Sequence, residues 1–393
     1  MFRLCRYATT SKVAEMTPAV IIVPEPERTA DVIRVVQFAK DNDVAVAVRT
    51  GGHCYMGASS TSGRNIQLDL EHTFRTKQRL SAAELVHLDA FGAGCNRDLV
   101  YLRVGVSVSL GEFNQWLFDN RLFVPHGLCK GVFLGGHVQT GGYGNFIRSF
   151  GLFCDYIYEL TVVTANGEDG TDSGPIVRTV HRGDDLFYAL LGGSPGNFGV
   201  LTGMVVGVLQ DALHVAHGLK MAIAYDPARL ESLLAIVAEN STRSRGFDLN
   251  VSVLSAYQDV VSLFPSSDAK FRKLLGASAY GQDEMLIWPA SIAVFAQWVS
   301  QGPEDTFDSS GAREWFSSLC AMRHGESMLF TFINDYAGSF MPALRMVKPD
   351  IPTPPSRLSA IWLFTNIREY PMPYVKRNYI TTLSGAELQR RGW

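Results

Sequence analysis

The sequence predicts an α+β protein of two domains, and three observations lead to this class. The chain has 393 residues, enough for two or three domains at roughly 150 residues each. Between residues 50 and 207, glycines are dense and separate short runs of Val, Ile and Leu that are typical of strands. After about residue 212 glycine thins out, and amphipathic helical spacing alternates with strand-like stretches. We therefore expect a first domain over residues 1–210, a second over 211–370, and a short C-terminal segment over 371–393.

The composition gives no support for a nucleic-acid or membrane partner. A formal net charge of −3 with 19% charged residues indicates no basic patch for nucleic acid or an anionic membrane surface. No run reaches the roughly 18 apolar residues of a membrane-spanning helix. No secretory leader is visible, so the sequence leaves the localisation open. The six cysteines are scattered without metal-binding spacing. We expect a monomer without a metal.

The first elements follow one another within about 30 residues. β-Branched runs at residues 20–23 and 44–48 predict two strands. Between them Thr29 can cap a helix that ends near Asp43. The apolar face of this helix includes Val32 and Val36. A strand, a helix and a second strand at this spacing predict a βαβ unit.

The remaining elements are predicted from shorter patterns. Further strands are expected at residues 66–70, 86–90, 160–163 and 200–208, and short helices at 110–120 and 184–191. In the second domain an amphipathic helix is expected at 227–239, before alternating or apolar stretches at 249–254 and 285–298. This mixture predicts an α+β arrangement there as well.

The first motif with chemical meaning is Arg49-Thr50-Gly51-Gly52-His53, which directly follows a predicted strand. Tandem glycines let backbone N–H groups approach a ligand closely, and successive amides form an anion-binding nest. With the cation of Arg49 beside it, a pyrophosphate is a natural occupant. A tight turn with a surface histidine explains the spacing about equally well.

The second motif covers residues 125–145, where seven glycines between positions 127 and 144 alternate with bulky apolar residues. Glycine pays extra backbone entropy in helices and strands, so we expect neither there. A main chain that lies against a large flat ligand explains the composition. The alternative is a flexible linker, which Val132, Phe133 and Leu134 disfavour because linkers lack such residues.

A third motif, Gly192-Gly193-Ser194-Pro195-Gly196, matches the G-x-S-x-G pattern of hydrolases. That pattern needs the backbone N–H of the residue after the serine for its oxyanion hole, and Pro195 has none. The segment also follows a helix-like run and not a strand. We therefore exclude a serine hydrolase.

Taken in order, these motifs resemble the berberine bridge enzyme-like flavoproteins of the vanillyl-alcohol oxidase/p-cresol methylhydroxylase superfamily. The resemblance covers residues of about 17–210 and includes Arg148-Ser149-Phe150-Gly151-Leu152 and Gly196-Asn197-Phe198-Gly199-Val200. It implies a two-subdomain FAD-binding domain of the p-cresol methylhydroxylase type. An α+β substrate domain with an antiparallel sheet would follow.

The resemblance also implies how FAD is held. In that family a histidine and a cysteine at these motif positions bond covalently to the flavin, and they match His53 and Cys129 here. Imidazole nitrogen and thiolate are both able to add to an electron-poor ring near neutral pH. The other implied cofactor contacts are Arg49, Thr50, Gly51, Gly52, Gly57, Ser59, Gly127, Leu128, Val132, Gly135, Gly136, Gly141, Gly142, Gly144, Gly199 and Val200.

The implied activity is an FAD-dependent oxidase. It would take hydride from an alcohol or amine carbon of a carbohydrate or secondary metabolite, and pass the electrons to dioxygen to give hydrogen peroxide. Tyr143 matches a family tyrosine that assists as acid, base or orienting group, although simple packing beside the cofactor explains it equally well. Val132 matches the position that controls access of dioxygen.

Two other hypotheses remain open at this stage. The Tyr/Asn-rich strand and the Y-D-P helix of the family's C-terminal region are not found in this sequence. A catalytically impaired paralogue that binds flavin or serves a structural role is therefore an alternative. A dehydrogenase that passes electrons to another acceptor is the third hypothesis.

Overall fold

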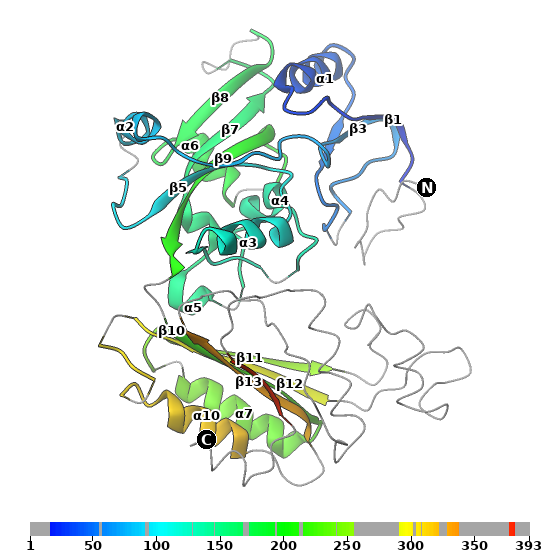
Figure 1. Cartoon of the computed structure of the whole chain (residues 1–393). Helices are drawn as coiled ribbons and strands as arrows, with labels where there is room; N and C mark the ends of the chain where they lie inside the picture. The colour runs from blue at the N-terminus through cyan, green and yellow to red at the C-terminus, as the bar shows by residue number, and fades with distance from the viewer. Residues whose placement is uncertain are drawn as a thin grey trace, which may run out of the picture. The chain divides into compact units, whose positions relative to one another are not determined.

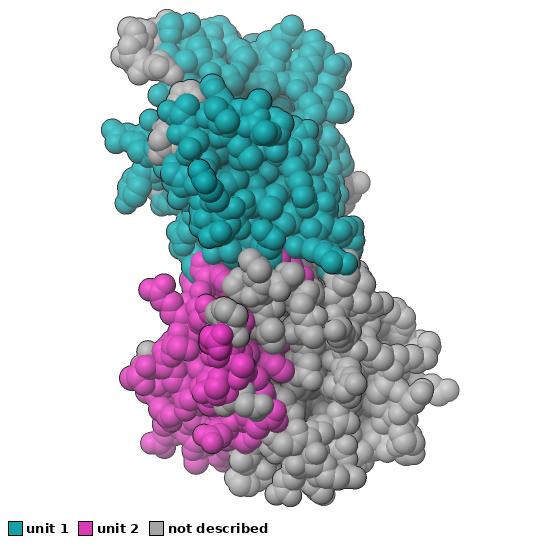
Figure 2. All heavy atoms as spheres, turned by 60° about the vertical axis from the view of Figure 1, so that its left-hand side comes forward, with its two compact units in different colours: residues 1–144, 151–210 teal, residues 145–150, 211–393 magenta. Residues whose placement is uncertain are grey.

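The structure is a computed structural model (Figure 1). It describes residues 16–54, 57–90, 94–127, 129–144, 146–167, 173–192, 195–211, 215–240, 242–254, 291–301, 304–307, 309–321, 328–337 and 377–381. The chain divides into two compact units, coloured separately in Figure 2: residues 1–144 with 151–210, and residues 145–150 with 211–393. Among the described residues, no helix has the length and apolar character needed to cross a membrane.

The first unit begins with a three-stranded parallel sheet, ordered β1-β3-β2. Its strands are β1 (Pro18–Ile22), β2 (Val46–Arg49) and β3 (Gly63–Asp69), and the helix α1 (Thr29–Asp41) connects β1 to β2. The predicted strand-helix-strand order is correct. However, β3 lies between the two strands and pairs with both of them in parallel. The end of β2, and the loop that follows it, is thereby fixed beside the end of β3.

A second, antiparallel sheet forms the rest of the unit, in the order β4-β5-β9-β7-β8. Its strands are β4 (Lys77–Arg79), β5 (Val100–Gly105), β7 (Ile157–Thr164), β8 (Ile176–His181) and β9 (Val200–Gln210), with β6 (Leu122–Phe123) paired to β9. Side chains from β5, β7 and β9 alternate between its faces. One face carries Leu102, Leu160 and Met204 into the main core, which also includes residues of α1 and β3.

The other helices of this unit are short. They are α2 (Ala82–Ala90), α3 (Leu110–Asp119), α4 (Leu134–Gln139), a 3-10 turn (Phe153–Tyr156) and α6 (Asp185–Leu190). At the start of α3, Ser109 Oγ accepts a hydrogen bond from the N–H of Glu112 at 3.2 Å, and the Glu112 carboxylate accepts from the Ser109 N–H at 3.0 Å. This reciprocal capping fixes where the predicted helix begins.

The predicted strand over residues 86–90 is wrong, because these residues belong to α2. The alternation of Val86, Leu88 and Ala90 indicates a strand by period, but only Leu88 is buried, and Val86 is 72% exposed. The helix signal lies just upstream, where the Glu84 carboxylate accepts from the Ser81 N–H at 2.8 Å. A cap three residues before a carboxylate is a start signal for a helix.

The expectation that the glycine-rich segment contains no helix is also wrong. Residues 134–139 form α4 although Gly135 and Gly136 lie in its first turn. Leu134 and Val138, four residues apart, are both fully buried in the main core. Tertiary packing of these two side chains therefore outweighs the low helix propensity of glycine.

The second unit is built on one antiparallel sheet in the order β11-β12-β10-β13-β14. The strands are β10 (Val215–Ala224), β11 (Phe247–Leu254), β12 (Ser291–Val299), β13 (Met328–Ala337) and β14 (Arg377–Thr381), and the helices are α5 (Ile147–Phe150), α7 (Pro227–Asn240) and α10 (Ala312–Ala321). Figure 1 shows α7 and α10 on one side of this sheet. The α+β class is thus confirmed. Of the predicted stretch 285–298, residues 285–290 lie outside the described residues.

The core of this unit lies between the sheet and the two longer helices. Leu233 of α7, Phe316 of α10 and Trp298 of β12 are fully buried in it. Asp248 on β11 pairs in register with Gln297 on β12. Its Oδ2 atom is buried and has no hydrogen-bond partner among the described residues, and burial raises the pKa of this carboxyl group to about 6.

Candidate functional site

The two glycine-rich segments, far apart in sequence, meet in the first unit. A Cβ atom placed on Gly51 would lie 2.7 Å from Cδ1 of Phe133 and 3.1 Å from the carbonyl oxygen of Gly131. A Cβ atom placed on Gly135 would lie 3.4 Å from Cγ2 of Thr50. Glycine at these positions therefore allows the loop that carries His53 to lie directly against the segment after Cys129.

The first segment starts from a buried ion pair. Arg49, the last residue of β2, is 3% exposed, and its Nη2 pairs with Oδ2 of Asp69 at the end of β3. The carboxylate of Glu71 lies 4.0 Å from the same nitrogen. The charge of Arg49 is thus compensated within the protein, so it fixes where the loop leaves the sheet. The predicted role of Arg49 as a cation beside the loop amides stays a prediction.

The loop itself turns through two glycines with positive φ, Gly52 at 69° and Gly57 at 77°. The Gly57 N–H donates to the Cys54 carbonyl at 3.0 Å, and the Ser60 N–H donates to the Gly57 carbonyl at 3.0 Å. Ser59 Oγ is buried and has no hydrogen-bond partner among the described residues. A buried hydroxyl in this state fits a loop that receives a polar ligand, because leaving such a group unpaired costs stability.

The second segment runs antiparallel to residues 106–111 before it enters α4. The Leu110 N–H donates to the Val132 carbonyl at 2.7 Å, and the Gly135 N–H donates to the Val106 carbonyl at 2.8 Å. Cys129, just ahead of this stretch, is an exposed cysteine. An exposed thiol is accessible for bond formation with a ligand. Leu128 lies outside the described residues.

His137 of α4 organises the glycine-rich segment. Its Nε2 accepts a hydrogen bond from the Gly127 N–H at 3.0 Å, ten residues earlier in the chain. Burial, and secondarily the neighbouring His126, lowers the pKa of His137 to about 4. The imidazole is therefore neutral at pH 7, which leaves Nε2 free of a proton and able to accept. No pattern in the sequence predicts this role of His137.

Several glycines predicted to line the cofactor are required by this local packing. A Cβ atom on Gly127 would lie 2.7 Å from Cε1 of His137, and one on Gly142 would lie 2.9 Å from its Nε2. A Cβ atom on Gly144 would overlap the carbonyl oxygen of His126. In contrast, Gly136 is exposed and has nothing within 4 Å of its Cβ position. Of these four positions, only Gly136 leaves open space for another molecule.

The segment around Gly199 is tied to α4 by one side chain. Gln139 donates from Nε2 to the Gly135 carbonyl at 2.8 Å, and its Oε1 accepts from the Gly196 N–H at 3.1 Å. Gly199 has a φ of 135°, and its Cβ position would lie 2.6 Å from the Val163 carbonyl oxygen. Val200 is 5% exposed and packs in the main core. Gln139 carried no signal in the sequence, because its two partners are backbone groups.

The remaining predicted residues differ in exposure. The Tyr143 side chain is 74% exposed, so it is available to a ligand and does not fill the core. Its carbonyl oxygen would lie 3.3 Å from a Cβ atom on Gly127, which places it beside the Gly127 backbone. His53 and Val132 are half-buried. The predicted site is therefore a set of main-chain loops with accessible side chains at positions 129 and 143.

Comparison with known proteins shows what the first part of the chain is similar to. A family described as FAD binding domain matches residues 20–169, the part of the chain that forms these loops. The cofactor that the fold implies is thus FAD. The buried Ser59 hydroxyl, the positive-φ glycines and the open Gly136 position fit such a group.

Within this class, the resemblance to the berberine bridge enzyme-like FAD-linked oxidases is confirmed. The chain is 31% identical over 206 residues to berberine bridge enzyme-like 19 of Arabidopsis thaliana, which is 52% of this chain and 31% of that protein. It is 33% identical over 187 residues to tetrahydroberberine oxidase of Argemone mexicana, covering 47% of this chain and 30% of that protein.

Solved structures show the same fold over more of the chain. BBE-like 1 of Physcomitrella patens has a TM-score of 0.58 at 17% identity, with 85% of this chain and 57% of that one covered. Xylooligosaccharide oxidase from Myceliophthora thermophila C1 has a TM-score of 0.53 at 17% identity, with 81% and 54% covered. The matches span less than two thirds of each of these relatives.

Proposed function

We propose that this protein is an FAD-dependent oxidoreductase that acts as an oxidase. FAD, when bound, supplies the hydride acceptor, and dioxygen takes the electrons on to give hydrogen peroxide. The contact between Gly51 and the Phe133 and Gly131 positions is the observation that carries the proposal. It brings the loop that carries His53 against the glycine-rich segment that carries Cys129. Neither a simple turn nor a flexible linker would explain this contact. The similarity to tetrahydroberberine oxidase of Argemone mexicana supports the activity.

His53 and Cys129 are proposed as two covalent anchors for the flavin. Each lies two residues from one partner of the contact between positions 51 and 131. The thiol of Cys129 is exposed, and a thiolate or a neutral imidazole can add to an electron-poor ring. Two anchors on loops held by backbone hydrogen bonds would restrain the ring without enclosing it.

Tyr143 and Val132 are proposed to act on the substrate and on dioxygen. The Tyr143 side chain is exposed, and this supports a role in which its phenol orients a substrate hydroxyl or amine or exchanges a proton with it. The Val132 carbonyl accepts a hydrogen bond from the Leu110 N–H, which fixes the backbone that carries its side chain. We propose that this side chain controls the access of dioxygen. We propose residues 1–210 as the cofactor domain and 211–370 as the part that selects an alcohol or amine substrate.

Mass spectrometry of the tryptic peptides that contain residues 53 and 129 tests the anchors. We expect the two peptides to be joined through one and the same flavin, and the protein to stay yellow after acid precipitation. His53→Ala and Cys129→Ala should each leave one attachment, whereas Cys95→Ser, at a free cysteine outside the two loops, should leave both. Unmodified peptides from yellow protein would contradict covalent attachment.

A turnover assay tests the oxidase. Flavin absorbance should bleach without oxygen when a suitable alcohol, sugar or amine is added, and peroxide should form when air is admitted. Val132→Leu should slow reoxidation by dioxygen and leave anaerobic bleaching unchanged. Bleaching that never leads to peroxide would show a dehydrogenase instead.

A further inference from the structure

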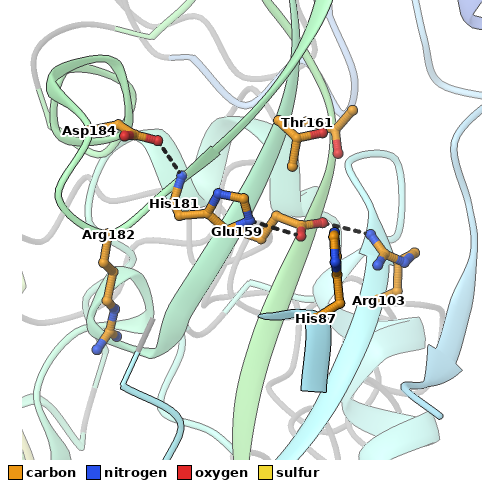
Figure 3. Close-up of a pocket in the computed structure, with 8 residues that line it drawn as sticks. His87, Arg103, Glu159, Thr161, His181, Arg182 and Asp184 are labelled. Atoms are coloured by element: carbon orange, nitrogen blue, oxygen red, sulfur yellow. Dashed lines mark hydrogen bonds and ion pairs between the residues drawn. The ribbon is translucent and has the colours of Figure 1, made fainter. Parts of the chain in front are cut away.

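A hollow lies on the second sheet, on the face opposite the glycine-rich loops. Leu102 and Leu160 point to the face that packs with Leu134 of α4 in the main core. Arg103 and Thr161, which follow them in β5 and β7, alternate to the other face. The hollow has a volume of about 490 Å³, within the roughly 300–1,000 Å³ range of small-molecule sites. It is lined by His87, Arg103, Glu159, Thr161, Thr179, His181, Arg182 and Asp184 (Figure 3).

A buried carboxylate is the centre of this hollow. The Glu159 side chain is 7% exposed, and its Oε1 accepts from Arg103 Nη1 at 2.7 Å. Its Oε2 lies 3.3 Å from Nε2 of His181, which neighbours it on β8. Figure 3 shows Glu159 between these two partners. The other side of Arg103 faces the carboxylate of Glu84 on α2, at 3.6 Å.

Two hydroxyl groups extend the polar lining beyond the carboxylate. Thr161 and Thr179 pair in register across β7 and β8, two residues from the Glu159–His181 pair. On its other side Thr161 pairs with Gly203 of β9. Because Gly203 has no side chain, that position of the face stays uncovered. Half of the lining therefore forms a row of donors and acceptors along one strand pair.

The charges of the lining select the class of ligand. Its two arginines balance its two carboxylates, and both arginines are engaged. Arg182 donates from Nε to the Ile157 carbonyl at 2.8 Å and stacks 4.1 Å over the Tyr158 ring. A charged ligand would have to break the Glu159–Arg103 pair. A neutral molecule with several hydroxyls would not, since a carboxylate has about four acceptor sites and a guanidinium five donors.

We propose that this hollow is a binding site for a neutral saccharide of one or two sugar units, separate from the cofactor loops. Adjacent hydroxyls of a sugar can donate to Glu159 and Asp184 while they accept from Arg103, His87 and the two threonines. The site has no part in the proposed flavin chemistry, and it stands whether or not the chain is an oxidase.

The test is saturation-transfer NMR of the full-length protein with cellobiose. We expect saturable binding with a dissociation constant on the order of 1 mM. The double variant Thr161→Val/Thr179→Val keeps the β-branched shape and removes both hydroxyls, so it should weaken binding roughly tenfold. Thr76→Val, which removes the same atoms outside the hollow, should bind like the parent. His87→Ala, an exposed change on α2, gives a second test that leaves the sheet intact.

The outcomes separate the proposal from its alternatives. Cellobiose at the flavin would change the flavin absorbance, and that change should survive in the threonine double variant. The proposal is overturned if cellobiose does not bind in a saturable way, because the network would then only brace β5, β7 and β8. Equal affinity in the parent, the double variant and His87→Ala would also overturn it, as would displacement of cellobiose by inorganic phosphate.

Discussion

Replacing His137 by glutamine should remove a defined pH dependence from the stability of the first unit. The pKa of His137 in the folded chain is about 4, against about 6.5 for a free imidazole. Between these values the unfolded chain binds a proton on this ring and the folded chain does not, so acidification favours unfolding. From pH 7 to pH 4.5 this difference lowers the free energy of unfolding by about 2 kcal/mol.

The magnitude also has a pH-independent part. His137→Gln disturbs the acceptor of the Gly127 N–H and the ring contact with Phe153, whose centroid is 5.7 Å away. We expect a loss of about 1–3 kcal/mol at pH 7. Glutamine does not titrate. The difference in free energy of unfolding between the parent and the variant should therefore decrease by about 2 kcal/mol between pH 7 and pH 4.5.

Urea unfolding followed by circular dichroism at pH 7, 5.5 and 4.5 measures both parts. His72→Gln makes the same change at an exposed position and should track the parent at every pH. Carboxylates common to both proteins cancel in the difference. A parent-minus-variant free energy that stays constant from pH 7 to 4.5 would refute the reasoning that His137 folds in its neutral form.

Three further predictions concern other groups of the chain. Gln139→Leu removes the side-chain hydrogen-bond partner of the Gly196 N–H and of the Gly135 carbonyl, so urea unfolding should show a loss of about 1–3 kcal/mol, whereas Gln115→Leu, which breaks only an exposed hydrogen bond to Asp119 on α3, should be near neutral. Gly144→Ala should lower the yield of folded protein because its Cβ overlaps the His126 carbonyl, and Gly136→Ala, in open space within α4, should gain about 0.5–1 kcal/mol; equal yields and stabilities would contradict the packing argument. Asp248→Asn should stabilise the protein at pH 8 by about 1–2 kcal/mol. The pKa of the Asp248 carboxyl is raised to about 6, so the folded protein loses stability as pH rises from about 4 through 6 and this buried group ionises. Differential scanning calorimetry should show that the gain vanishes at pH 4.

Elements with strong local signals are predicted well by the sequence. The helix over residues 110–120 has a capping box and a buried face, and it forms as α3 with bounds that differ by one residue. The strand over residues 86–90 fails because its alternation is a property of only three side chains, while the decisive Ser81–Glu84 cap lies outside the stretch. The alternation of residues 86–90 contains no information on the cap upstream, and it does not show that Val86 faces solvent while Leu88 is buried.

The site was predictable as motifs and not as contacts. The glycines of both segments stand out in the sequence, but their reasons differ: Gly127, Gly142 and Gly144 surround His126 and His137, and Gly51 admits Phe133. The ion pair of Arg49 with Asp69 was not predictable, because Asp69 follows twenty residues later in β3, which lies between β1 and β2. Such pairings depend on sheet order, which no short-range pattern specifies.

The six residues 145–150 have a mechanical consequence. They belong to the second unit, although the chain before and after them belongs to the first. Arg148 Nη2 donates to the Arg243 carbonyl at 2.7 Å, and Ser149 Oγ donates to the Arg245 carbonyl at 2.8 Å. The backbone therefore passes from one unit to the other three times, at residues 144/145, 150/151 and 210/211. A protease cut at one of these crossings would leave two tethers intact, and a pull on the second unit would reach Tyr143 through only two peptide bonds.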